Sequence, residues 1–264
     1  MDGISVPRDP GGIDYERLVD FIRNRHRKDG CFAPVPSLPS TVADTWYGVS
    51  LCLLLDPLVP ELGVAAMLDR ERIRVFVQGH DELLGSLPLR ICYFLGLLHE
   101  FATGNWPEFP SSLLTRASST GPDWEHRFYL GRLFPEKSQP PVTGQPDLGR
   151  ATCRDVFFFL RLGPRSDASQ LGAWLRGCQN DDGGFGFFPG TTSYMEYSDY
   201  ALSALHLLGD RPDNPEQASR FIRYCQTGSG GFSRSIRALP FLESSYHAVR
   251  ALQVLAHMAQ DRMG

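Results

Sequence analysis

Residues 174–190 read WLRGCQNDDGGFGFFPG, and this stretch is one of three copies of a pattern that decides the fold. The other two copies begin at Phe21 and at Phe221. Each copy has an aromatic and an aliphatic residue, three residues, Gln or His, three residues, Gly, one residue and a second aromatic residue. Because the spacing is the same each time, we interpret the pattern as an internal repeat.

Each copy is followed by a loop and then by an apolar segment with helical periodicity. These segments are Val42–Leu55, Tyr194–Leu208 and Phe241–Met258. Glycine permits a tight turn or a close backbone approach, and a Gln amide can bind one N–H and one C=O at once. The repeat therefore predicts a helical hairpin, whose Gln ties its turn to the next hairpin.

The succession of predicted helices continues between the copies, although the repeat motif itself is no longer recognisable there. Further second helices are predicted at 87–101, 124–134 and 151–162, and shorter first helices at 69–77 and 110–118. The Pro-rich stretch 135–149 is predicted to lack a helix. No segment of convincing length alternates apolar and polar residues as a strand would. We therefore predict an all-α (α/α)6 toroid, a single domain over residues 1–264 with some outer helices short or missing.

Composition excludes several classes of protein. An apolar fraction of 42% with 21% charged residues excludes a disordered chain. A net charge of −4 gives no basic surface for nucleic acid, and no apolar run approaches the ~20 residues of a membrane span. Six cysteines lie singly without a CxxC pair, and the N-terminus is polar. We therefore expect free thiols, no signal peptide and a cytoplasmic location.

Residues 174–190 and 221–235 closely resemble the repeat shared by protein prenyltransferase β subunits and by squalene, oxidosqualene and class II diterpene cyclases. In the cyclases it is called the QW motif, and here Phe185 and Phe232 stand where Trp is usual. The resemblance implies a toroid whose central cavity holds an isoprenoid chain, and thus a role in terpenoid biosynthesis.

Metal chemistry is one possibility that the resemblance raises. Protein prenyltransferases hold zinc with an Asp-x-Cys pair and a distant His. Asp29-Gly30-Cys31 matches the pair literally, but the repeat places it in the glycine turn and not at the start of an inner helix. His247 alone does not make a tetrahedral site. We expect no zinc and no other cofactor, with magnesium only where a substrate diphosphate bridges it.

Acid chemistry is the other possibility. Class II cyclases protonate their substrate with an Asp of a D-x-D-D-T element, and Val42-Ala43-Asp44-Thr45 resembles its end, with Ala43 in place of the usual donor. Another group must then supply the proton. The candidate catalytic residues are Asp44, Asp155, Asp199 and His247. Helix capping, a core ion pair and a satisfied core histidine are the competing structural interpretations.

Substrate binding is predicted for aromatic and basic side chains of the inner helices. Aromatic faces attract carbocations, and arginines at helix starts suit phosphate oxygens. The candidates are Trp46, Tyr93, Phe158, Tyr197, Tyr200, Tyr246, Arg90, Arg127 and Arg154. Tyr200 and His247 hold equivalent repeat positions and should lie toward the same rim. The alternative for the aromatic residues is that they simply fill the core, and the alternative for the arginines is that they are solvated on the surface.

Three functional hypotheses follow from these residues. The first is a terpene cyclase-like enzyme that cyclises a prenyl chain by proton-initiated carbocation chemistry. The second is a prenyltransferase that moves a prenyl group to an acceptor, with a partner subunit or as a homo-oligomer. The third is a toroid that binds an isoprenoid or a partner without catalysis.

Overall fold

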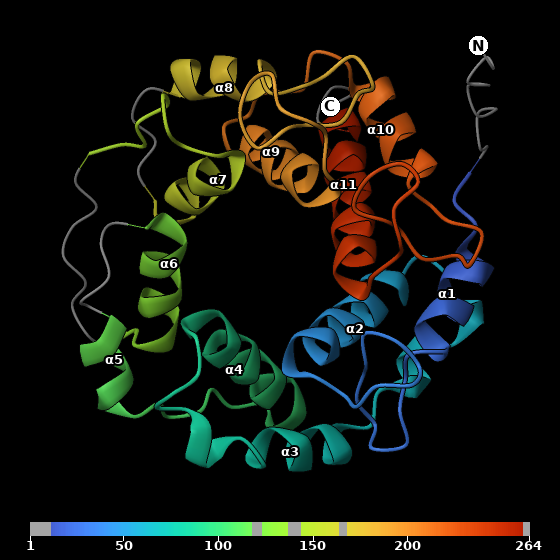
Figure 1. Ribbon diagram of the computed structural model, residues 1–264, viewed down its shortest axis with the longest axis vertical. Helices are drawn as coiled ribbons and strands as arrows, with labels where there is room; N and C mark the ends of the chain where they lie inside the picture. The colour runs from blue at the N-terminus through green and yellow to red at the C-terminus, as the bar shows by residue number, and fades with distance from the viewer. Residues whose placement is uncertain (1–11, 118–122, 137–143, 164–167, 261–264) are drawn as a thin grey trace.

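Inner helices form a ring, and shorter helices surround it (Figure 1). This computed structural model describes residues 12–117, 123–136, 144–163 and 168–260. The inner helices are α2 (Val42–Leu55), α4 (Leu89–Thr103), α6 (Trp124–Leu133), α7 (Cys153–Arg161), α9 (Met195–Leu207) and α11 (Leu242–Gln260). The outer helices are α1 (Tyr15–Arg23), α3 (Arg70–Gln78), α5 (Ser111–Ala117), α8 (Ala168–Arg176) and α10 (Pro215–Tyr224). Short 3-10 turns cover Pro60–Leu62, Val64–Met67 and Asp81–Leu83.

The ring is closed. Each inner helix packs against the next one along the chain, and α11 packs against α2 as well as against α9. Outer helices α3, α5, α8 and α10 pack against the inner helices that follow them. No strand occurs in the described residues. The predicted all-α toroid is therefore confirmed.

The missing outer helix was expected between α6 and α7. Residues 135–136 and 144–149 of the Pro-rich stretch contain no helix, whereas residues 137–143 lie outside the described part of the chain. All six predicted second helices are present, with ends that differ by a few residues from the predicted ones. The six cysteines are buried and free. Among the described residues, no helix is both long and apolar enough to cross a membrane.

The repeat glutamines join neighbouring hairpins, as their chemistry predicts. Gln179 accepts from the backbone N–H of Asn214 at 3.0 Å and donates to the Asn214 carbonyl oxygen at 2.9 Å, at the start of α10. Gln226 makes the same pair of bonds with Asp14, at 3.0 and 2.9 Å, at the start of α1. Asp14 precedes Gln226 by 212 residues. The bonds of Gln226 therefore join the last hairpin to the first and help to close the ring.

The repeat glycines allow a close approach of two backbones. Gly183 and Gly230 have φ of +89° and +91°, in the left-handed region. A Cβ atom at Gly183 would clash with the carbonyl oxygen of Gln217, and one at Gly230 with that of Arg17. Each turn therefore lies directly on the next outer helix.

A hydroxyl group in each repeat fixes the turn to the inner helix. Ser198 and Ser245 each accept a bond of 2.9 Å from the backbone N–H of the repeat aromatic, Phe185 and Phe232 respectively. Thr45 accepts the equivalent bond at 3.2 Å. These serines and this threonine are the fourth residues of their helices, so the repeat also fixes the register of the residues that follow them.

Candidate functional site

The fifth and sixth residues of the six inner helices form a belt around the axis of the ring, here called the aromatic belt. Ten of these twelve residues are aromatic. They are Trp46, Tyr47, Tyr93, Phe94, Phe128, Tyr129, Phe157, Phe158, Tyr200 and Tyr246. The other two are Asp199 and His247. The shared helical register brings all twelve to one level, because equal positions on equally oriented helices face the same axis.

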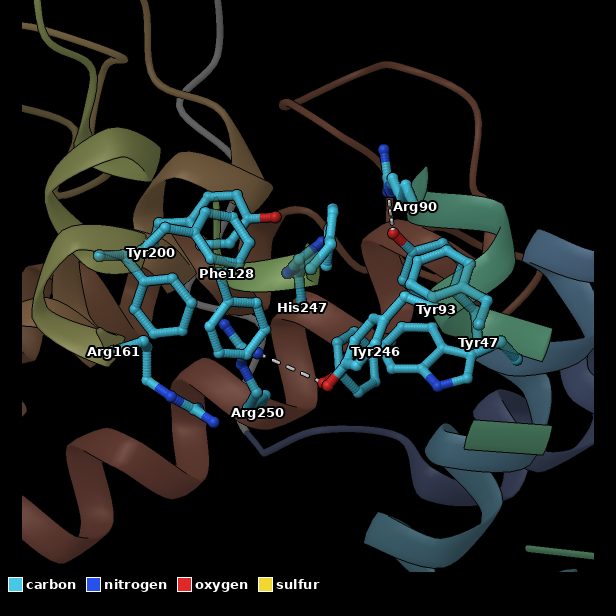
Figure 2. A pocket seen from close by; sticks show the side chains of 14 residues that line it. Tyr47, Arg90, Tyr93, Phe128, Arg161, Tyr200, Tyr246, His247 and Arg250 are labelled. Carbon is cyan, nitrogen blue, oxygen red and sulfur yellow. Dashed lines mark hydrogen bonds between the residues drawn. The ribbon is translucent and has the colours of Figure 1, made fainter. Parts of the chain in front are cut away.

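The belt encloses a cavity of about 140 Å³. All ten belt aromatics line it, and ring contacts join most of them; Trp46 and Phe94, for example, stack with centroids 4.3 Å apart. The polar groups on the wall, besides the tyrosine hydroxyls, are those of Arg90, Arg161, His247 and Arg250 (Figure 2). No aspartate or glutamate side chain is on the wall among the described residues.

The two non-aromatic belt residues bind each other. Nδ1 of His247 lies 2.6 Å from Oδ2 of Asp199, and Arg250 donates from Nε to Oδ1 of the same carboxylate at 2.8 Å. Ser203 donates a further bond to Oδ1 at 3.2 Å. The Asp199 side chain is fully buried and that of His247 is 3% exposed. The belt is therefore interrupted at one place, by a single connected network.

Charge fixes the orientation of the His247 ring. Burial alone would raise the pKa of Asp199, but the Arg250 guanidinium and the hydrogen bond from His247 hold it below its ordinary value. An ionised Asp199 can only accept, so Nδ1 of His247 carries a hydrogen. Nε2 of His247 is buried and has no hydrogen-bond partner among the described residues. This atom belongs to a ring that faces the cavity, in the centre of Figure 2.

A second ion pair lies on the other side of the belt. Glu243 accepts from Arg90 and from the Tyr47 hydroxyl, both at 2.6 Å, and Arg90 also bonds to the Tyr47 oxygen. The Arg90 and Tyr47 side chains are drawn together in Figure 2. Arg90 and Glu243 are second residues of α4 and α11, so this pair lies toward the N-terminal rim of the ring.

Guanidinium groups already cover several belt rings. Arg250 lies 5.4 Å from the centroids of both Phe157 and Tyr246. Arg161 lies 5.3 Å from the centroid of Phe128, and Arg90 lies 5.3 Å from that of Phe94. The cation-binding faces of the belt are thus partly occupied by the chain's own charges.

The structure brings together most of the residues predicted to bind substrate. Those on the cavity wall are Trp46, Arg90, Tyr93, Phe158, Tyr200 and Tyr246, together with the candidate catalytic His247. Tyr200 and His247 are both sixth residues of their helices, with ring centroids 5.4 Å apart, as their repeat positions predicted. Asp199 lies directly behind His247.

Besides Asp199, five predicted residues lie away from the cavity wall. Tyr197 packs against Phe187, Arg127 lies over the Trp124 ring, and Arg154 is paired with Glu125 at 3.3 Å. Asp44 and Asp155 are third residues of α2 and α7, and each accepts from the N-cap threonine that precedes its helix. Both carboxylates therefore stabilise helix starts.

Arg161 and Arg250 line the cavity but were not among the predicted site residues. Both are ninth residues of their inner helices, one turn beyond the belt. Their signal in the sequence is this shared register, which becomes visible only when the six inner helices are aligned by their first residues.

A metal site finds no support in the described residues, where no three His, Cys, Asp or Glu side chains gather as ligands. Burial raises the pKa of Cys31 to about 12, and Asp29 accepts from the Cys31 backbone N–H at 3.0 Å within its own turn. The Asp29-Gly30-Cys31 string is therefore part of the repeat turn. That the protein needs no cofactor stays a prediction.

Two family models match different parts of the chain. The model for the squalene-hopene cyclase N-terminal domain matches residues 152–235, and that for the prenyltransferase alpha-alpha toroid domain matches residues 4–79. Both models describe members of the terpenoid cyclase and prenyltransferase toroid superfamily, to which these two parts of the chain are similar. The two matched parts contain the three repeat copies almost completely, and together with the closed ring they point to an isoprenoid-related family of enzymes. No curated protein matches the chain.

Proposed function

We propose that this toroid is a terpene cyclase-like enzyme that folds a prenyl chain against the aromatic belt and rearranges it by moving a proton at Nε2 of His247. One observation carries the proposal: His247, whose Nε2 is buried and has no hydrogen-bond partner among the described residues, is part of a cavity wall that is otherwise aromatic and basic. A group that exchanges protons with a substrate must face it without a protein partner of its own.

Asp199 then acts as a positioning residue. Its carboxylate holds Nδ1 of His247 and so fixes which nitrogen faces the cavity. Because Arg250 also binds Asp199, the carboxylate stays ionised and is a poor acid. The imidazolium form of His247 would give its Nε2 proton to an alkene carbon, and the neutral form would take a proton from a neighbouring carbon. The product of these two transfers is an isomer of the substrate.

The aromatic wall supports the cationic intermediate in this scheme, because ring faces attract a carbocation by about 0.5–2 kcal/mol each. The rings of Trp46, Tyr93, Tyr129 and Phe158 are on the wall, and no guanidinium lies over them among the described contacts. These four rings would be the ones free to contact the cation.

The experiment is an incubation of the purified protein with prenyl diphosphates of five to twenty carbons and with squalene, followed by mass spectrometry before and after phosphatase treatment. We expect a product isomeric with one substrate, absent in His247→Gln. A product seen only after phosphatase treatment would mean that the diphosphate is retained. Unchanged turnover in His247→Gln would contradict the proposal.

A second candidate function is a toroid that binds an isoprenoid without converting it. The observation in its favour is that Asp199, His247 and Arg250 already satisfy one another, as a purely structural core network would. Tight binding of a prenyl diphosphate with full recovery of the substrate after long incubation would favour this second function.

A further inference from the structure

Three inner helices carry an arginine one turn beyond the aromatic belt. Arg132, Arg161 and Arg250 are the ninth residues of α6, α7 and α11. A helical residue three or four positions after another lies on the same face, one turn along the axis. These arginines therefore lie toward the C-terminal ends of the inner helices. Figure 2 shows Arg161 and Arg250 on the same side of the belt, with Arg90 on the opposite side.

Two of the arginines converge on one ring. The guanidinium carbon of Arg161 lies 5.8 Å from the Phe157 centroid, and that of Arg250 lies 5.4 Å from it. Burial raises the pKa of the Tyr93 phenol, and the neighbouring charges of Arg132 and Arg161 oppose part of this rise. Arg161 and Arg250 thus border the same part of the cavity, whereas Arg132 is exposed and lies off the cavity wall.

The charge in this region is not balanced. Arg250 is paired with Asp199, and Arg90 on the far side is paired with Glu243. Arg161 and Arg132 are both exposed, and neither lies within ion-pair distance of a carboxylate in the described part of the chain. A cavity with uncompensated guanidinium groups attracts an anion, and their planar forks suit carboxylate and phosphoryl oxygens.

We propose that Arg161 and Arg250, which both line the cavity, form an anion site on the C-terminal side of the aromatic belt that binds the carboxylate or phosphoryl group of a ligand with an apolar part of about one ring. The proposal rests on the proposed function, since it names the ligand class of the same cavity.

The size of the cavity sets the size of the apolar part. At about 140 Å³ the cavity is close to the ~150 Å³ cavity that admits benzene. Sites for larger organic ligands usually measure about 300–1,000 Å³. The belt can therefore take one ring or a branched five-carbon group, and a longer chain must extend out of it.

The test is calorimetric binding of four probes: benzoate, phenyl phosphate, benzyl alcohol and inorganic pyrophosphate. We expect the better of the two ring-bearing anions to bind at least tenfold more tightly than benzyl alcohol. Benzoate against phenyl phosphate decides between carboxylate and phosphoryl groups, and pyrophosphate shows whether the apolar part contributes. Arg161→Gln should weaken anion binding at least tenfold and leave the affinity for benzyl alcohol unchanged. Arg161→Lys, which keeps the charge, should weaken anion binding by less.

The matched control is Arg74→Gln, on the outer helix α3, where Arg74 is exposed and paired with Glu71. It should bind all four probes like the wild type. Equal affinity for benzoate, phenyl phosphate and benzyl alcohol, or anion affinity in Arg161→Gln within twofold of the wild type, would overturn the anion site. Anion binding as expected without any prenyl turnover would leave the site standing and reject the proposed reaction. Turnover without anion binding would reject the anion site and leave the proposed reaction standing.

Discussion

The Asp199 carboxylate is fully buried and holds two side chains of α11 in place. Removing one partner of a buried ion pair usually costs about 3–5 kcal/mol, because the other charge stays buried. We expect Asp199→Ala to lower the free energy of unfolding by about this amount in urea denaturation. Ser203→Ala, which removes only the weaker bond to the same carboxylate, should cost about 1 kcal/mol or less. Equal losses in the two variants would contradict the network described here.

The lowered pKa of Asp199 also predicts a dependence of stability on pH. A carboxyl group whose pKa is lower in the folded than in the unfolded state stabilises the fold fully above the unfolded pKa of about 3.9. This contribution is lost as the pH falls through the lower folded-state pKa. Between pH 6 and pH 2.5 the wild type should therefore lose more stability than Asp199→Asn, which cannot titrate there. Parallel stability curves for the two proteins would show that Asp199 is not held ionised.

At the scale of the helical hairpin, Gln179 and Gln226 make equivalent bonds with different consequences. Each ties its turn to the next outer helix, but only the bonds of Gln226 with Asp14 join the last hairpin to the first. A hydrogen bond contributes about 1 kcal/mol, so Gln226→Ala and Gln179→Ala should each cost about 1–2 kcal/mol. Amide hydrogen exchange in α1 should become faster in Gln226→Ala and stay unchanged in Gln179→Ala. Faster exchange in α1 of both variants would contradict the closing role of Gln226.

The turn glycines give a sharp comparison within one loop. Gly230 has a positive φ, and a Cβ atom there would meet the Arg17 backbone, whereas Gly228 has no neighbouring atom within 4 Å of such a Cβ. Gly230→Ala should destabilise the fold by more than about 2 kcal/mol, since strain and a backbone clash act together. Gly228→Ala should change stability by less than about 0.5 kcal/mol. Thermal unfolding of the two variants measures the difference.

The hairpins were predictable because their turns need particular residues. The glycine turn, the bridging Gln and the apolar second helix each leave a sequence signal. In the last hairpin the structure shows them at Gly230, at Gln226 and in α11. The aromatic wall was also predictable in part, because five of its aromatic residues were expected to bind substrate, as was Arg90. Asp199 and His247 were candidates, but their mutual bond was not foreseen, since it joins residues 48 positions apart.

Other parts of the site left no signal in the sequence. Whether an acidic residue near a helix start caps the helix or faces the axis depends on one position of register, and Asp44 and Asp155 cap their helices. Arg127 and Arg154 lie near helix starts, as arginines at the mouth of the cavity would. Arg127 instead lies over the Trp124 ring, and Arg154 is paired with Glu125. Arg161 and Arg250 were missed because nothing local distinguishes an arginine beside a cavity from one on the surface.

At the scale of the whole molecule, ring closure decides what the cavity is. Twelve belt positions from six helices meet at one level, and α11 against α2 completes the wall. The toroid therefore has a small aromatic cavity with one Asp–His pair in its wall and arginines on both sides. A fold does not by itself set a reaction, and this pair is the feature on which the proposed chemistry depends.

The most direct test of that chemistry is deuterium incorporation. The prenyl substrate that is converted would be incubated in D2O with the wild type and with His247→Gln, and the product analysed by mass spectrometry. Because the Nε2 proton of His247 exchanges with solvent, the wild-type product should carry one carbon-bound deuterium, and His247→Gln should form no product. A product without deuterium, or the same deuterated product from His247→Gln, would contradict proton transfer at His247.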